Sequence, residues 1–193
     1  FIEDDPIKGW YADPTTTTEV AAYLHENPSS PILSLQGKAE LGPRALGNRS
    51  ILANPTCGRV KDILNTIKGR EDWRPVAPIA LEEDGREYFK SGYDPYMLYE
   101  TGIRNGGDIP AVVHIDNTSR VQTVNTSQNK PVADLLASFK NLSGVGVLCN
   151  TSANENGCGF FSRLSEASRW ASKNGVVKIW TGEFLYTYDS NQS

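Results

Sequence analysis

The chain is poor in the residues that most often build metal centres and disulfide frameworks. It has two histidines, His25 and His114, and three cysteines in 193 residues, with no close Cys-x-x-Cys pair. This scarcity argues against a metal site or a disulfide framework made by this chain, and it favours a reducing, cytoplasmic location. No apolar run approaches the roughly 20 residues that cross a bilayer, so no membrane partner is expected.

The sequence also lacks the pattern of a serine hydrolase. It contains no Gly-x-Ser-x-Gly turn, and Ser152 has only His25 and His114 as conceivable bases. We expect His25 at the end of a surface helix and His114 within a strand, far apart in the chain. A nucleophilic serine–histidine pair is therefore not predicted.

Positive charge is concentrated in one part of an acidic chain. The formal net charge is −4, yet eight of the 19 lysines and arginines lie between residues 38 and 74. Bulk electrostatics would not draw such a chain to nucleic acid. A compact anionic ligand suits this basic stretch better than a long polyanion.

The spacing of apolar residues predicts a mixed α/β domain. Thr16 to Glu19 forms a capping-box pattern at the start of a helix, and residues 60–67 follow the spacing of an amphipathic helix. Two more helices are predicted around residues 132–139 and 164–172. Strands are predicted at residues 31–35, 76–81, 97–103, 111–115, 120–124, 145–149 and 176–188, with a turn at 116–119. The first dozen residues and the last four are expected to be poorly anchored.

Three stretches carry candidate chemistry. The first, from Gly37 to Ile51, has three glycines and a proline with Lys38, Arg44 and Arg49 on or near it. Glycines let backbone N–H groups approach an anion, and arginine grips phosphate or carboxylate through two hydrogen bonds. A surface turn with solvated arginines is the alternative interpretation.

The second stretch runs from Lys68 to Pro75, directly after a predicted helix. Its lysine and two arginines form a like-charge cluster that an anion would relieve, although cations at a helix C-terminus also stabilise the helix dipole. Trp73 fits a core position as well as a base-stacking one.

The third stretch, Cys149 to Gly157, follows an apolar run. It places Ser152 and Asn154 at the carboxyl end of a strand, where α/β sheets bind ligands. Alone, it is also compatible with a generic turn.

Together these stretches resemble the carbamoyltransferase family, which makes carbamoylated antibiotics and nodulation factors and has phage relatives. The resemblance covers about Gly37 to Tyr186, and the combination of motifs is specific. The matching segments are Glu40 to Ile51 (ELGPRALGNRSI), Arg74 to Pro78 (RPVAP), Val112 to Asp116 (VVHID), Ser119 to Val124 (SRVQTV) and Asn150 to Asn154 (NTSAN).

The resemblance implies a YrdC/Sua5-like twisted mixed β-sheet with flanking helices. It also implies that the domain converts ATP and carbamoyl phosphate into carbamoyl-adenylate and pyrophosphate, with Mg²⁺ travelling with the ATP. Lys68 and Arg74 would be catalytic, Ser152 and Asn154 would bind phosphate and carbamoyl groups, and Arg44, Arg49 and Arg120 would be further binding residues. Such chemistry needs positioning and cationic stabilisation rather than a protein nucleophile.

The family's other half is N-terminal and is not matched here. It resembles the universal tRNA threonylcarbamoylation protein, holds iron or a similar metal, and transfers the carbamoyl group to an acceptor hydroxyl. The chain begins with Phe1 and is expected to be a piece of a longer protein, with residues 1–14 as a leading segment, 15–189 as the domain and 190–193 as a tail. Nucleic acid would be a partner only if the acceptor is a nucleotide.

Two other functions stay open, and one segment departs from the family. The chain could be a free-standing threonylcarbamoyl-adenylate synthase, or a module that binds nucleotide or RNA without catalysis. After Asn154 the family usually continues with a Gly-Glu-Pro segment, whereas residues 155–161 here read ENGCGFF. This difference is expected to alter the nucleotide pocket or a loop beside it.

Overall fold

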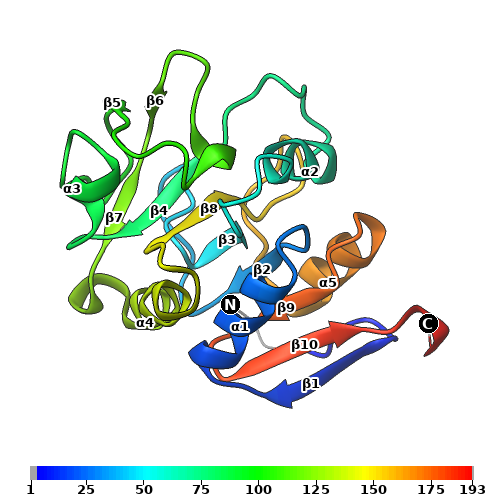
Figure 1. Cartoon of the computed structure of the whole chain (residues 1–193). Coiled ribbons are helices and arrows are strands. Elements are labelled where there is room, and N and C mark those ends of the chain that lie inside the picture. Colours follow the sequence, from blue (N-terminus) through cyan, green and yellow to red (C-terminus); the bar gives the residue numbers. More distant parts are fainter. Residues whose placement is uncertain (1–3, 193) are drawn as a thin grey trace.

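The computed structural model describes residues 4–192 and shows a mixed α/β domain (Figure 1). An eight-stranded sheet has the strand order β1-β10-β9-β2-β3-β8-β4-β7, and β5 and β6 form a separate pair. The strands are β1 (Trp10–Pro14), β2 (Ile32–Leu35), β3 (Arg49–Ala53), β4 (Ala77–Leu81), β5 (Thr101–Gly102), β6 (Thr118–Ser119), β7 (Gln122–Val124), β8 (Val147–Ser152), β9 (Lys178–Trp180) and β10 (Phe184–Tyr188).

Five α-helices lie in the described part of the chain. They are α1 (Thr17–Glu26), α2 (Val60–Ile67), α3 (Gly85–Tyr88), α4 (Thr126–Ser143) and α5 (Leu164–Lys173), with short 3₁₀ helices η1 (Pro110–Val112) and η2 (Ser190–Gln192). Helix α1 packs against α4, which in turn packs on β4, β7 and β8, while α5 packs on β9. None of the helices described here is long and apolar enough to span a membrane.

Local sequence explains where the helices begin. The predicted capping box is confirmed at α1, where the Glu19 backbone N–H donates to Thr16 Oγ1 and Glu19 Oε2 accepts from the Thr16 backbone. Helix α4 starts with a second capping box between Asn125 and Gln128. These reciprocal bonds satisfy backbone donors that have no partner within the helix.

The mixed α/β class and most of the strongly patterned elements are confirmed. The predicted helices at residues 60–67 and 164–172 correspond to α2 and α5, and the helix around 132–139 is the second half of α4. The run at 176–188 is two antiparallel strands rather than one, because the chain turns at Gly182, whose φ is 98°.

Two further strand predictions need correction, and one strand was missed. The run 111–115 is not a strand: Ala111 and Val112 are buried in the 3₁₀ helix η1, and the chain continues as a loop in which Ile115 is fully exposed. The run 97–103 holds only the two-residue β5. Strand β3 was missed because it opens with the polar pair Arg49 and Ser50, both buried, which hides the apolar pattern of a central strand.

The leading segment is partly anchored. Trp10–Pro14, expected to be poorly anchored, forms β1 and pairs with β10 over five residues. At the other end, residues 190–192 form η2. Phe1, Ile2, Glu3 and Ser193 lie outside the described residues.

The strand order brings the three chemically interesting stretches to one edge of the sheet. Strand β8 lies between β3 and β4 and is antiparallel to both, with Ser152 opposite Ser50 and Asn150 opposite Ala77. The carboxyl end of β8 therefore meets the amino ends of β3 and β4. Strand β7 is parallel to β4, so Arg120, two residues before β7, comes to the same edge.

Candidate functional site: an arginine cavity at the end of β8

A cavity of about 120 Å³ lies at this edge. Its basic walls come from three segments: Arg44 from the loop before β3, Arg70 from the segment after α2, and Arg120 from the residue run before β7. We call it the arginine cavity, and its other lining residues are Pro43, Ala45, Pro75, Ala77, Met97, Asn150, Thr151 and Ser152. None of the described residues that line it carries a carboxylate.

Two of the cavity's arginines have buried hydrogen-bond donors without a partner among the described residues. The buried Nε atoms of Arg70 and Arg120 have no partner among the described residues, although Arg70 Nη2 donates to Asn65 Oδ1 at 2.9 Å. Burial lowers the pKa of Arg120 and the charge of Arg44 lowers it further, while the charges of Glu100 and Asp94 partly oppose this shift. Burial and the charge of Arg74 have the same effect on the pKa of Arg70. Gathered positive charge with buried, unpartnered donors is the signature of an anion-binding site.

Two side-chain amides and a carboxylate form hydrogen bonds that hold the loop carrying Arg44. Asn150 Nδ2 donates to the carbonyl of Ala45 at 2.9 Å, and Gln122 Nε2 donates to that of Leu46 at 2.9 Å. Glu40 Oε1 accepts from the backbone N–H groups of Leu46 and Asn48 at 2.6 and 3.0 Å. The loop is therefore tied to β7 and β8, which places Arg44 over the end of β8.

Arg49 is not on the cavity wall. Its side chain is buried, with the residue only 1% exposed, and its guanidinium donates to the carbonyls of Phe161 at 2.8 Å, Gln36 at 2.6 Å and Gly37 at 3.1 Å. These bonds join both sides of the glycine-rich loop to the segment before α5. The geometry gives Arg49 a positioning role in place of the ligand contact that the sequence suggested.

Lys68, Ser152 and Asn154 are brought together as the sequence predicts. The buried Lys68 Nζ donates to the carbonyl of Ser152 at 2.9 Å, to the carbonyl of Asn154, and to Asn154 Oδ1 at 2.8 Å. All three ammonium donors thus fix the chain that leaves β8. Burial, followed by the charge of Arg70, lowers the pKa of Lys68 to about 8.

Arg74 lies apart from this group. Its Nε forms an exposed ion pair with Glu71 Oε2 at 2.8 Å, and its guanidinium lies 5.9 Å from the centre of the Trp73 ring. Arg74 is not among the residues that line the arginine cavity, whereas Arg70 is. Sequence reasoning placed Arg70 in the basic cluster but did not select it; its position two residues after Lys68, where the chain leaves α2, was the available signal.

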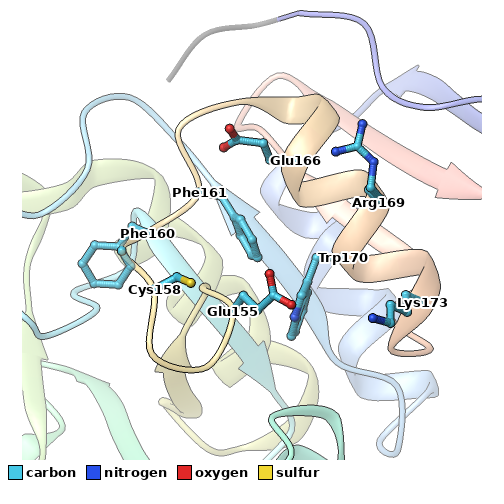
Figure 2. Close-up of a pocket in the computed structure, with 9 residues that line it drawn as sticks. Glu155, Cys158, Phe160, Phe161, Glu166, Arg169, Trp170 and Lys173 are labelled. Atoms are coloured by element: carbon cyan, nitrogen blue, oxygen red, sulfur yellow. The ribbon is translucent and has the colours of Figure 1, made fainter.

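The segment that departs from the family borders a second pocket, which we call the α5 pocket (Figure 2). It measures about 400 Å³ and combines aromatic rings with charges of both signs: Glu155, Cys158, Gly159, Phe160, Phe161, Glu166, Arg169, Trp170 and Lys173. The Phe161 and Trp170 rings lie 5.5 Å apart, and Lys68 Nζ lies 5.6 Å from the centre of the Trp170 ring. Lys68 therefore separates this pocket from the arginine cavity.

The residues described in the structure contain no group of three or more histidine, cysteine, aspartate or glutamate side chains placed to hold a metal ion. His114 lies in a loop rather than in the predicted strand, and its Nδ1 is 3.3 Å from Thr118 Oγ1. The arrangement is thus an α/β domain with a candidate anion site, lined by arginines and amides at a strand end.

Comparison with known proteins identifies the family. The model of the family "Carbamoyltransferase C-terminus" matches residues 22–187, so the chain belongs to the carbamoyltransferase family as its C-terminal domain. Nodulation protein U of Sinorhizobium fredii is 45% identical over 181 residues, which are 92% of this chain and 32% of that protein. The 3'-hydroxymethylcephem-O-carbamoyltransferase of Amycolatopsis lactamdurans is 40% identical over 190 residues, 96% of this chain and 36% of that protein.

The chain therefore spans about a third of the length of these curated relatives. Among solved structures, a variant of Sua5 from P. abyssi is similar, with 12% identity and a TM-score of 0.47 over 75% of this chain and 40% of that one.

Proposed function

We propose that this chain is the carbamoyl-adenylate-forming domain of an ATP-dependent O-carbamoyltransferase. The observation that carries the proposal is the arginine cavity, with the buried, unpartnered Nε atoms of Arg70 and Arg120 at the end of β8. Two anionic substrates must be held together in this reaction, and three guanidinium groups line the cavity, with the nearby carboxylates of Glu100, Asp94 and Glu71 outside its lining. The choice of a carbamoyl group as the group transferred is supported by the names of the relatives, which include an O-carbamoyltransferase.

The chemistry that this site would support is electrostatic. Carbamoyl phosphate and water give carbamate and phosphate; a carbamate oxygen then attacks the α-phosphorus of ATP, and the bond to pyrophosphate breaks. Negative charge moves onto the leaving pyrophosphate, and fixed guanidinium groups stabilise that charge without reorganising. Arg44, Arg70 and Arg120 would do this, while Lys68 holds Ser152 and Asn154 in place for the substrate oxygens.

Magnesium and the acceptor belong to this proposal as well. The cavity has no carboxylate, so Mg²⁺ would enter with the phosphates of ATP rather than be held by this chain. The acceptor hydroxyl, and the iron or similar metal expected in this family, would lie in the N-terminal part of the longer protein.

The direct test is exchange of labelled pyrophosphate into ATP by this chain with Mg²⁺. We expect exchange that depends on carbamoyl phosphate, because formation of the adenylate is reversible and needs no acceptor. Bicarbonate with threonine replaces carbamoyl phosphate in a parallel reaction. Exchange only with bicarbonate and threonine would overturn the proposal in favour of a threonylcarbamoyl-adenylate synthase. ATP binding without exchange under either condition would favour a binding module.

The rate of exchange should fall as the pH rises through about 8. The pKa of Lys68 is lowered to about 8, so the ammonium that holds Ser152 and Asn154 predominates below this value and is lost above it. The profile of kcat/KM between pH 6 and 9.5 reports this titration in the free protein. A Lys68→Arg variant, at its own residual rate, should lose the inflection because arginine stays charged; an unchanged inflection would assign the titration to another group.

A further inference from the structure

A larger hollow adjoins the arginine cavity. It measures about 620 Å³, and we call it the Trp73 pocket; its lining is Lys61, Trp73, Pro75, Val113, His114, Ile115 and Asp116. Pro75 lines both hollows, so the two share a wall. The segment after α2 contributes Arg70 to one hollow and Trp73 to the other.

Two large apolar side chains that line the Trp73 pocket are exposed to solvent and are not packed in the core. Trp73 is 74% exposed and Ile115 is fully exposed, whereas Trp10, Trp170 and Trp180 are buried. Clustered, exposed apolar side chains beside polar groups mark surfaces that bind a partner or ligand. Here the polar groups are Lys61, His114 and Asp116.

The volumes of the two cavities indicate which part of a nucleotide each one could hold. The arginine cavity, at about 120 Å³, can take phosphate groups but not a whole nucleotide. The Trp73 pocket, at about 620 Å³, falls in the range of small-molecule sites, roughly 300–1,000 Å³. A ligand with an anionic end and a flat aromatic end would fill both hollows at once.

We infer that the Trp73 pocket binds the base and ribose of the nucleotide whose phosphates lie in the arginine cavity, with the base stacked on the Trp73 indole. This inference rests on the proposed function for the presence of a nucleotide. Stacking on an aromatic ring suits any base. The guanidinium of Arg74 lies 5.9 Å from the centre of the Trp73 ring and is paired with Glu71.

The α5 pocket is the competing location, and it is less suitable. Figure 2 shows the Glu155 carboxylate lying beside Trp170, and Glu166 is on the same pocket wall. These two carboxylates offset the charges of Arg169 and Lys173 on the same pocket, so its lining has no excess of positive charge for an anionic ligand. Lys68 and its partners also stand between this pocket and the arginine cavity.

Tryptophan fluorescence reports on this site because Trp73 is exposed and the other three tryptophans are buried. We expect iodide to quench mainly Trp73 in the free protein, and ATP with Mg²⁺ to protect it. Inorganic tripolyphosphate, which has the phosphates but no base, should bind without protecting it. Equal protection by ATP and tripolyphosphate would overturn the inference.

Binding measured by calorimetry supplies the second readout. Trp73→Ala should raise the Kd for ATP about tenfold and leave the Kd for tripolyphosphate unchanged, while Trp73→Phe should retain most of the affinity. Leu142→Ala, at an exposed residue near the end of α4, is the matched surface control. If Phe160→Ala weakens ATP binding and Trp73→Ala does not, the base lies in the α5 pocket and the inference is wrong.

These measurements are independent of carbamoyl transfer. A protein that shows Trp73-dependent ATP binding but no pyrophosphate exchange would keep this inference and contradict the proposed function. Pyrophosphate exchange that is unaffected by Trp73→Ala at subsaturating ATP would support the proposed function and contradict this inference.

Discussion

Replacing Arg70 with methionine is expected to reduce carbamoyl-phosphate-dependent pyrophosphate exchange by about 10³-fold. Arg70 lines the arginine cavity, and its buried Nε has no partner among the described residues. A guanidinium placed in this way stabilises charge that develops on the leaving pyrophosphate. Among the described residues its side chain forms one hydrogen bond, to Asn65, which limits the cost in unfolding free energy to about 1–2 kcal/mol. Exchange rates and urea unfolding, measured on the same preparation, separate the two effects.

Arg74→Met is the matched control, since it removes the same charge four residues away. Arg74 is exposed, pairs with Glu71 and does not line the cavity, so exchange should fall less than about tenfold. The family resemblance implies that Arg74 is the catalytic arginine, whereas we propose Arg70 because it lines the cavity. A larger loss with Arg74→Met than with Arg70→Met would support the resemblance and contradict the geometry.

The sequence predicted the elements whose apolar spacing is regular and failed where polar residues are buried. The helix at residues 60–67 could be predicted because its apolar positions repeat at helical spacing. Strand β3 could not, because Arg49 and Ser50 look like loop residues until their buried partners are known. The strand prediction at residues 111–115 was wrong for the opposite reason: apolar residues such as Ala111 and Val112 can be buried in a 3₁₀ helix as well as in a β-sheet.

The candidate site was predicted in its segments and less well in its individual residues. The three stretches were each recognisable, and the order β3-β8-β4 brings them together. Sequence alone does not tell which arginine of a cluster faces the cavity. Arg44, Arg70 and Arg120 do so, while Arg49 points into the protein and Arg74 into solvent. Side-chain direction depends on the long-range pairing of strands, which local sequence does not encode.

Arg49 and Arg44 have the same side chain, five residues apart, with opposite physical roles. Arg49 is buried and donates to carbonyls of Phe161, Gln36 and Gly37. Burial lowers the pKa of its guanidinium, and nearby Glu40 raises it. Arg44 is exposed and lines the arginine cavity. Mutation of the first should therefore affect folding, and mutation of the second should affect ligand binding.

Arg49→Met is expected to lower the unfolding free energy by about 3–5 kcal/mol, because it removes a buried guanidinium and its hydrogen bonds to the carbonyls of the buried residues Gln36 and Phe161. At this chain length such a loss corresponds to a fall in Tm of roughly 10 °C. Arg44→Met should change the unfolding free energy by less than about 0.5 kcal/mol and weaken tripolyphosphate binding instead. Urea unfolding followed by circular dichroism, with calorimetry for the anion, measures both. An Arg49→Met protein that is as stable as Arg44→Met but no longer binds the anion would return Arg49 to the ligand-binding role that the sequence suggested.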